Sequence, residues 1–247
     1  MNEIVIVTGA SRGIGAAIAY QLASSGYTVG CISRSGSLPQ VEAPEPEVMA
    51  RCAALSADVT DEGALRKAIA DLAASGARLV GLVNNAGFHT ECPSAELSLA
   101  EWRAVMAGNA ESVIVGCQAA FPFLRDSGGL IVNIGSFFDK LGVKQNLAYC
   151  ASKAAVGSIS RVLAVEWARH GIAVVNIAPG YILTDLNRDD WEKPGGMLRP
   201  YLEKRIPGRK PGSPRDIAAL TANLFSTSGT FLSGETIYVD GAQALVA

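Results

Sequence analysis

The sequence predicts an α/β protein built on one doubly wound parallel sheet of seven strands, with helices on both faces. Seven short apolar runs alternate with helical stretches along the 247 residues, and short turns connect them, which is the pattern of successive strand–helix–strand units. A glycine-rich turn directly follows the first run. No repeat or long linker divides the chain, so we expect residues 1–247 to form a single domain.

Each strand is predicted from a short apolar run, because strands of a parallel sheet are buried on both faces. The expected strands are 3–8, 27–32, 51–56, 79–83, 130–134, 172–177 and 234–241. The expected helices are 16–25, 61–75, 99–124, 149–169 and one that opens at Pro214. Asn109 disfavours a helix interior, so we expect a local break there. Three prolines exclude a regular helix across 36–47.

Composition excludes several classes of protein. The net charge of −2 and the pI of about 5.8 leave no basic excess for nucleic acid. No apolar run reaches the ~18 residues of a membrane span, and no secretion signal is visible. Five scattered cysteines indicate reduced thiols in a cytoplasmic protein. Neither His89 nor His170 is clustered with cysteines or carboxylates, so we expect no metal site.

The glycine-rich turn between the first strand and the first helix predicts a dinucleotide site. Gly9 allows the tight turn, Gly13 lets the backbone approach a pyrophosphate, and Gly15 permits close packing of helix on strand. The helix N-terminus supplies free N–H groups and a positive dipole end for phosphate. A strand, glycine turn and helix in this order are typical of a Rossmann fold.

The end of the second strand indicates which dinucleotide binds. An acid there would bind the ribose 2′-hydroxyl of NAD, whereas an arginine accommodates the 2′-phosphate of NADP. The chain has Ser33 and Arg34 at this point, and Arg12 in the glycine turn is a second cation. We therefore expect NADP(H) rather than NAD(H). A solvated loop position for Arg34 is the alternative.

Tyr149 and Lys153 are four residues apart at the start of a predicted helix, so their side chains lie on one face. A free tyrosine has a pKa of ~10, and we expect the neighbouring ammonium to lower it. Such a phenol can protonate a carbonyl oxygen or deprotonate an alcohol. Alone, the pair is also consistent with a surface contact. Ser136 follows a buried apolar run and is a third polar residue that accompanies Tyr149 and Lys153.

Together these motifs resemble the short-chain dehydrogenase/reductase family. The matches are the three glycines, the Asn84-Asn85-Ala86-Gly87 element, and Ser136, Tyr149 and Lys153 in order, and the resemblance runs from residue 3 to about 242. It implies that Ser136 orients a carbonyl, Tyr149 transfers the proton, and Asn109 holds a relay water. Lys153 would also bind the nicotinamide ribose.

The resemblance implies further cofactor contacts. Asp58 would meet the adenine amino group, although an acid also suits the start of the helix at 61–75. The segment after the sixth strand would hold the nicotinamide. The expected cofactor-binding residues are Gly9, Ser11, Arg12, Gly13, Ile14, Gly15, Ser33, Arg34, Asp58, Val59, Asn85, Ala86, Gly87, Tyr149, Lys153, Pro179, Gly180, Ile182 and Thr184.

We therefore expect an oxidoreductase that moves hydride between NADP(H) and a ketone or secondary alcohol. One candidate substrate is a 3-oxoacyl thioester, because the pattern resembles the 3-oxoacyl-[acyl-carrier-protein] reductase branch. The other is a small cyclic or aromatic carbonyl, favoured by Phe137 and Phe138. Enoyl reductases of related fold place the lysine further from the tyrosine, which argues against carbon–carbon double-bond reduction. An NAD-dependent alcohol dehydrogenase and a catalytically silent dinucleotide-binding protein are the alternatives.

Two expectations concern the rest of the chain. Residues 185–206 mix charges with apolar side chains around Pro194-Gly195-Gly196, which is the composition of a mobile substrate lid. Basic residues between Arg199 and Arg215 could meet an acidic carrier, although a solvated face is more usual. The resemblance also implies a homo-oligomer, a dimer or tetramer, built on the helices at 99–124 and 149–169.

Overall fold

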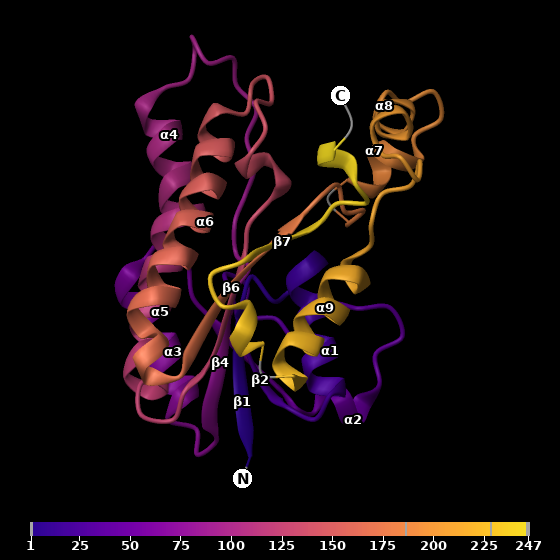
Figure 1. The fold of residues 1–247 in the computed structure, drawn as a ribbon. Helices are drawn as coiled ribbons and strands as arrows, with labels where there is room; N and C mark the ends of the chain where they lie inside the picture. The colour runs from indigo at the N-terminus through magenta and orange to yellow at the C-terminus, as the bar shows by residue number, and fades with distance from the viewer. Residues whose placement is uncertain (1, 186, 228, 246–247) are drawn as a thin grey trace.

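The computed structural model describes residues 2–185, 187–227 and 229–245. Its strands form one sheet in the order β3-β2-β1-β4-β5-β6-β7, and all neighbours are parallel (Figure 1). The predicted fold class is therefore confirmed. The strands are β1 (Glu3–Thr8), β2 (Thr28–Ser33), β3 (Cys52–Ser56), β4 (Arg78–Asn84), β5 (Gly129–Ile134), β6 (Ile172–Pro179) and β7 (Thr236–Val239).

Helices cover both faces of this sheet, as the side view in Figure 1 shows. Helices α1 and α9 pack together on one face, and α3, α5 and α6 lie on the other. The helices are α1 (Gly13–Ser24), α2 (Pro46–Met49), α3 (Glu62–Ala73), α4 (Leu99–Met106), α5 (Ser112–Leu124), α6 (Leu147–Trp167), α7 (Arg188–Glu192), α8 (Leu198–Arg205) and α9 (Pro214–Ser226).

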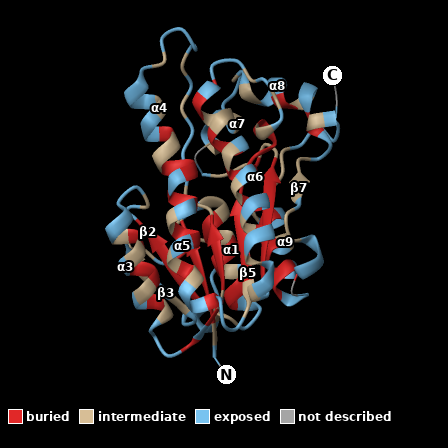
Figure 2. Cartoon of the chain, turned by 60° about the vertical axis from the view of Figure 1, so that its left-hand side comes forward, coloured by how far each residue is buried: buried red, intermediate tan, exposed pale blue. Residues whose placement is uncertain are grey.

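Alternation along the strands creates two cores, one on each face. In β1, Val5 and Val7 belong to the core beneath α1 and α9, whereas Ile4 and Ile6 belong to the core beneath α3, α5 and α6. The five inner strands are accordingly buried along most of their length, the edge strands β3 and β7 are only partly buried, and the outer helix faces are exposed (Figure 2). Burial on both faces explains why the strands read as continuous apolar runs.

The other predicted helix ends agree with the structure to within two residues, but two features differ more from the sequence prediction. Helix α1 begins at Gly13, three residues before the expected start. Helix α2 begins at Pro46, inside the 36–47 stretch from which a regular helix was excluded. Proline is tolerated in the first turn of a helix, where its missing N–H would have no partner. The exclusion was therefore wrong only at the end of that stretch, since residues 36–45 contain no helix.

The break expected near Asn109 is present. A π-helical turn at Ala107–Glu111 separates α4 from α5. The Asn109 side chain accepts a hydrogen bond from the Phe88 N–H and donates to the Phe88 carbonyl, each over 2.9 Å. It also donates to Ser152 Oγ over 3.1 Å. The break therefore joins the loop after β4 to helix α6.

A buried hydrogen-bonded chain fixes α6 against the sheet. Asn84 of β4 donates through Nδ2 to Asn133 Oδ1 of β5 over 2.8 Å. Asn133 donates in turn to Ser160 Oγ of α6 over 2.9 Å. All three residues are buried, and a buried polar group left without a partner is costly. This chain therefore sets the rotation and height of α6 over β5.

A substitution at Gly81 tests how tightly β4 packs against α9. A Cβ at this position would lie 2.6 Å from the Leu130 carbonyl oxygen and 2.7 Å from Phe225 Cζ. We expect Gly81→Ala to lower the free energy of unfolding by about 1–3 kcal/mol through overpacking. Gly63→Ala in α3 is the control: it meets Asp61 Oδ1 at an ordinary 3.5 Å and should stabilise by roughly 0.5–1 kcal/mol. Urea denaturation measures both, and equal stabilities would contradict this packing.

Candidate active site

The glycine turn is held by the element that follows β4. Gly9 has a positive φ of 65°, and a Cβ there would lie 2.9 Å from Ala86 Cα. The Asn85 amide donates to the carbonyls of Thr8 and Gly9 over 3.0 and 3.2 Å. Thr8 Oγ1 accepts from the Asn85 N–H over 3.0 Å. Thr8 escaped the sequence prediction, because a threonine at a strand end carries no signal of its own.

The start of α1 has the features of a phosphate site. Arg12 is the N-cap residue, and its side chain makes no capping bond, so the first N–H groups of the helix remain open. Gly13 has a positive φ of 59°, and a Cβ there would meet only the Thr184 side chain, at 3.6 Å. The helix dipole and open N–H groups favour an anion between Gly13 and Thr184. These residues fit the diphosphate of a dinucleotide.

The end of β2 is rich in hydroxyl groups. Ser33 Oγ lies 3.2 Å from Ser35 Oγ, which accepts from Ser37 Oγ over 2.9 Å. Arg34 is exposed between them. Asp58 follows β3, and hydrogen bonds from Thr60 lower its pKa, with a smaller lowering by the charge of Arg34. Hydroxyls and a guanidinium suit a phosphate monoester better than they suit a ribose hydroxyl.

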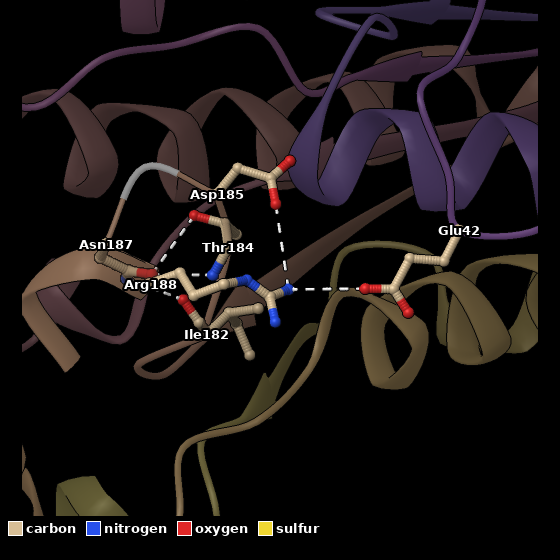
Figure 3. Close-up of polar contacts among 6 residues, drawn as sticks. All are labelled: Glu42, Ile182, Thr184, Asp185, Asn187 and Arg188. Atoms are coloured by element: carbon tan, nitrogen blue, oxygen red, sulfur yellow. Dashed lines mark hydrogen bonds and ion pairs between the residues drawn. The ribbon is translucent and has the colours of Figure 1, made fainter. Parts of the chain in front are cut away.

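The proline-rich loop after β2 borders the same site. Its Gln40 N–H donates to the Ser11 carbonyl over 3.0 Å, which places the loop against the glycine turn. Arg188 of α7 lies 4.0 Å from Glu42 of this loop and 3.9 Å from Asp185, as Figure 3 shows. Both contacts are long and exposed, and such ion pairs contribute little to stability. They nevertheless show that α7 reaches across to the loop after β2.

The segment predicted to hold the nicotinamide is braced by Asn187. Its Oδ1 accepts from the Thr184 N–H over 2.7 Å, and its Nδ2 donates to the Ile182 carbonyl over 3.0 Å (Figure 3). Asn187 is the N-cap residue of α7. This role was not predicted. The Asn187 side chain makes no capping bond to α7, and its hydrogen bonds instead run back to Thr184 and Ile182.

Other predicted cofactor residues have packing roles in the described structure. A Cβ on Gly180 would lie 2.6 Å from Asp240 Cα, so this glycine is required where β6 ends beside β7. Val59 packs against the core beneath α3 and α5. Pro179 ends β6 and is buried. Gly15 packs against the Gly9 carbonyl and the Asn85 amide, as predicted for its role in close packing.

Tyr149 and Lys153 lie in α6 beside the end of β5. The Lys153 ammonium is 5.7 Å from the centroid of the Tyr149 ring and donates to the Ile134 carbonyl over 2.9 Å. Ser136 lies close enough to Tyr149 for its hydroxyl to lower the pKa of the phenol. A Cβ on Gly87 would lie 3.0 Å from Asn109 Oδ1 and 3.6 Å from Lys153 Nζ. The structure therefore brings Asn109, Ser136, Tyr149 and Lys153 together.

The prediction that Lys153 lowers the pKa of Tyr149 is wrong for this structure. Burial raises the pKa of Tyr149 above its usual value, and the nearby Ser136 hydroxyl only opposes the rise. Burial also lowers the pKa of Lys153 to about 8, because a buried ammonium loses hydration. Lys153 is thus the first of the pair to lose its proton as pH rises. Near pH 7 the phenol is protonated, as a proton donor must be.

Asn109 lies where the resemblance puts it, but its side chain is engaged by protein. Both hydrogens of its amide are used, on the Phe88 carbonyl and on Ser152 Oγ, and an amide nitrogen has two to give. Ser152 donates in turn to the Tyr149 carbonyl over 2.8 Å. Within this geometry the Asn109 side chain orients the start of α6, and its relay of protons remains a prediction.

Aromatic rings surround the hydroxyl groups. The Phe138 ring lies 5.9 Å from that of Tyr149 and 6.1 Å from that of Tyr181. Phe137 lies 5.6 Å from Tyr181, and both phenylalanines are buried. Tyr181 directly follows Gly180 and was not predicted, because a tyrosine at a strand end reads equally well as core. These rings form an aromatic wall, defined here as Phe137, Phe138 and Tyr181.

Helix α8, in the segment predicted to be a lid, places Tyr201 next to Tyr181 of this wall. Burial raises the pKa of Tyr181 to about 12, and a hydrogen bond with Tyr201 of α8 adds to the rise. The segment is anchored at its base, where Leu183 N–H donates to the Gly212 carbonyl over 2.8 Å and Gly212 N–H donates to the Tyr181 carbonyl over 2.9 Å. A lid function for this segment stays a prediction. Leu186, within that stretch, lies outside the described residues.

His89 is a further side chain of the site that the sequence analysis missed. Its ring meets that of Tyr149 at 86°, with centroids 4.9 Å apart, and its Nε2 is hydrogen-bonded to Asn146 Oδ1. This role could not be predicted from the sequence, because Asn146 and Tyr149 are both more than fifty positions away along the chain. From sequence alone, a histidine in this loop is expected to be a surface residue without a role in the site.

Comparison with known proteins identifies the family. The model described as Enoyl-(Acyl carrier protein) reductase matches residues 9–242. D-threitol dehydrogenase of Mycolicibacterium smegmatis is 34% identical over 99% of this chain and 94% of its own length. 3beta-hydroxysteroid dehydrogenase 1 of Eggerthella lenta is 36% identical over the same shares. The 3-oxoacyl-[acyl-carrier-protein] reductase FabG of Staphylococcus aureus is 34% identical over 98% of both chains.

The chain belongs to the short-chain dehydrogenase/reductase family. It is therefore an oxidoreductase of the class whose members act on alcohol and ketone groups. Among solved structures, ElxO with NADP bound has a TM-score of 0.89 and 26% identity, with all of both chains covered. The three relatives are about equally similar to this chain, so the expected 3-oxoacyl reductase branch is not singled out.

Two negative findings apply to the described ranges 2–185, 187–227 and 229–245. None of their helices is both long and apolar enough to cross a membrane. They also contain no group of three or more histidine, cysteine, aspartate or glutamate side chains arranged to hold a metal ion.

Lys153 is expected to reduce the stability of the unliganded protein. Because its folded pKa of about 8 lies below the ordinary 10.5, the folded protein binds fewer protons than the unfolded chain between these values. The free energy of unfolding therefore rises with pH between about pH 8 and pH 10.5. Below pH ~8 the unfavourable contribution of the buried Lys153 ammonium is fully present. Lys153→Met should add up to about 3 kcal/mol at pH 7 while abolishing activity.

Chemical denaturation at pH 7 and pH 9.5 measures this effect. Lys67→Met on the exposed face of α3 is the control, with an expected change within roughly 0.5 kcal/mol. A Lys153→Met protein that is less stable than wild type at pH 7 would contradict the expectation.

Proposed function

We propose that this protein is an NADP(H)-dependent oxidoreductase that interconverts a compact ketone and the corresponding secondary alcohol. The observation that carries the proposal is the convergence of Ser136, Tyr149 and Lys153 beside an open helix N-terminus. The dinucleotide, when bound, supplies or accepts the hydride at its nicotinamide ring. The chain's own residues orient the substrate and transfer the proton.

In the reducing direction, Ser136 Oγ donates a hydrogen bond to the carbonyl oxygen and orients it. Tyr149 then gives its proton to the same oxygen as negative charge develops there. Lys153, an ammonium at pH 7 beside the phenol, stabilises the phenolate that remains. The alcohol leaves with one hydride on carbon and one proton on oxygen. A proton from solvent restores Tyr149, and Asn109 and its π-helical turn are proposed as part of that route.

Preference for NADP(H) is supported by the end of β2. Arg34 is an exposed cation between Ser33 and Ser35 in the chain, and the hydroxyls of these serines cluster with that of Ser37. Arg12 is an exposed cation of the glycine turn. The end of β2 carries no carboxylate, and the Asp58 carboxylate after β3 is engaged by Thr60. The related structure of ElxO contains NADP, which supports the same choice.

The aromatic wall favours a compact substrate over a long acyl chain, since Phe137 and Phe138 are buried. One observation favours a thioester instead: a surface hollow of about 580 Å³ at α8 and the residues just after it is lined by Lys204 and Arg209, and also by Glu203. Cations beside a hollow suit an acidic carrier or a coenzyme phosphate. The family model named for enoyl reduction fits less well, because Tyr149 and Lys153 are only four residues apart.

A homo-oligomer is also proposed. Helices α5 and α6 expose large apolar side chains, which soluble monomers rarely gather on one surface. Val165 is 80% exposed and Val162 51%. Leu147, Ile114 and Phe123 are exposed on the same two helices. Burial of these side chains between copies of the chain would remove them from water.

Removal of the phenol hydroxyl tests the proton donor. We expect Tyr149→Phe to lower kcat by about 10²–10⁴-fold while NADPH still binds, because the ring and its packing remain. Consumption of NADPH is followed with acetoacetyl thioester, cyclohexanone and butan-2-one as substrates. Ser136→Ala should also slow turnover. If Tyr149→Phe kept more than about a tenth of wild-type kcat, the assignment of Tyr149 would have to be withdrawn.

Reversal of charge at the end of β2 tests the cofactor. We expect wild type to bind NADPH more tightly than NADH, and Arg34→Asp to shift this preference toward NADH, because attraction for the 2′-phosphate becomes repulsion. Dissociation constants are measured by quenching of protein fluorescence. Arg51→Asp at the opposite end of the sheet is the control and should leave the ratio unchanged. Tighter binding of NADH by wild type would overturn the proposal.

A further inference from the structure

His89 lies at the reacting end of the site, although proton transfer does not require it. Its ring stands nearly perpendicular to the Tyr149 ring, with centroids 4.9 Å apart. It lies in the loop after β4, two residues beyond Gly87, and is exposed. A side chain that touches the proton donor and remains accessible is well placed to contact the substrate.

The position of the proton on His89 follows from the hydrogen bonds of Asn146. The Asn146 Nδ2 donates to the Lys144 carbonyl over 2.8 Å. Because a carbonyl can only accept, this bond fixes which end of the amide faces which way. Asn146 Oδ1 therefore faces His89 Nε2. Since Oδ1 is also only an acceptor, Nε2 carries the proton.

The other ring nitrogen of His89 is left free. In a neutral imidazole with its proton on Nε2, Nδ1 is an acceptor. Among the residues that the structure describes, Nδ1 has no hydrogen-bond partner, whereas Nε2 is engaged by Asn146. Tyr149 is thus flanked by two different rings: Phe138, which is apolar, and His89, which has an open acceptor.

We propose that His89 is a specificity-determining residue that accepts, through Nδ1, a hydrogen bond from a substrate hydroxyl on the carbon next to the reacting carbon. The preferred substrates would be vicinal diols and the matching α-hydroxyketones. Two adjacent oxygens suit two adjacent side chains, one oxygen reaching Tyr149 and the other reaching His89. This inference rests on the proposed ketone–alcohol chemistry and narrows its substrate class.

A matched pair of substrates tests the inference. Butane-2,3-diol and butan-2-ol differ by one hydroxyl, and reduction of NADP⁺ reports the oxidation of each. Wild type is expected to favour the diol by about tenfold in kcat/KM, equivalent to about 1.4 kcal/mol. His89→Phe keeps an aromatic ring against Tyr149 but removes the acceptor. It should lower kcat/KM for the diol about tenfold and change that for butan-2-ol by less than about twofold.

A second variant separates the acceptor from the ring. His89→Gln offers an amide oxygen in place of Nδ1 and should recover part of the preference for the diol. Binding of NADPH by both variants verifies that the fold is intact. Equal losses on both substrates would assign His89 to packing and overturn the inference, as would an unchanged ratio in His89→Phe.

The inference and the proposed function can fail separately. Turnover of other ketones by wild type, with no preference for the diol over butan-2-ol, overturns the role of His89 and leaves the ketone–alcohol chemistry standing. A wild-type protein that binds NADPH but turns over no carbonyl or alcohol overturns both.

Discussion

The buried chain from Asn84 through Asn133 to Ser160 is the constraint on which the geometry of the site depends. Tyr149, Lys153, Val156 and Ser160 are spaced by four, three and four residues, so they share one face of α6. Ser160 is tied to β5 by Asn133, and β5 leads directly to Ser136. One hydrogen-bonded contact two turns along the helix therefore sets where Tyr149 and Lys153 meet the serine.

The same contact explains why Asn84 and Asn133 are retained in the centre of a mostly apolar sheet. Asn84 donates to Asn133 and to Cys117 Sγ, and Asn133 donates to Ser160, so both buried side chains are hydrogen-bonded. An apolar pair would pack as well but would let α6 turn or slide over β5. Specific positioning of a helix is a use of buried polar networks that apolar packing does not provide. Lys153 then takes its place beside the Ile134 carbonyl, at a cost in stability to the unliganded protein.

Much of the fold and part of the site could be predicted from sequence. Strand runs, the glycine turn and the spacing of Tyr149 and Lys153 are local patterns, and the structure places them as expected. The direction of the pKa shift of Tyr149 could not be predicted, because it depends on burial by residues distant in the chain. His89 and Asn187 were missed for different reasons. The partners of His89 lie more than fifty residues away along the chain, whereas Asn187 bonds to nearby Thr184 and Ile182 through a turn that only the folded backbone shows. The short helix α2 was not predicted, because its first residue is a proline and prolines are tolerated only in the first turn of a helix.

The hydrogen bonds at the base of the segment between Leu183 and Gly212 separate the sheet and its catalytic residues from a segment whose length and sequence can change. Gly212 is hydrogen-bonded to Tyr181 and Leu183, so the chain between them is a loop closed at its root. The entropy of closing a loop grows only with the logarithm of its length, and a doubling adds about 0.6 kcal/mol. Segments of different length and chemistry can therefore be grafted above this root while the sheet, the glycine turn and the tyrosine stay unaltered. Replacement of this one segment is therefore enough to change the substrate while the scaffold stays the same.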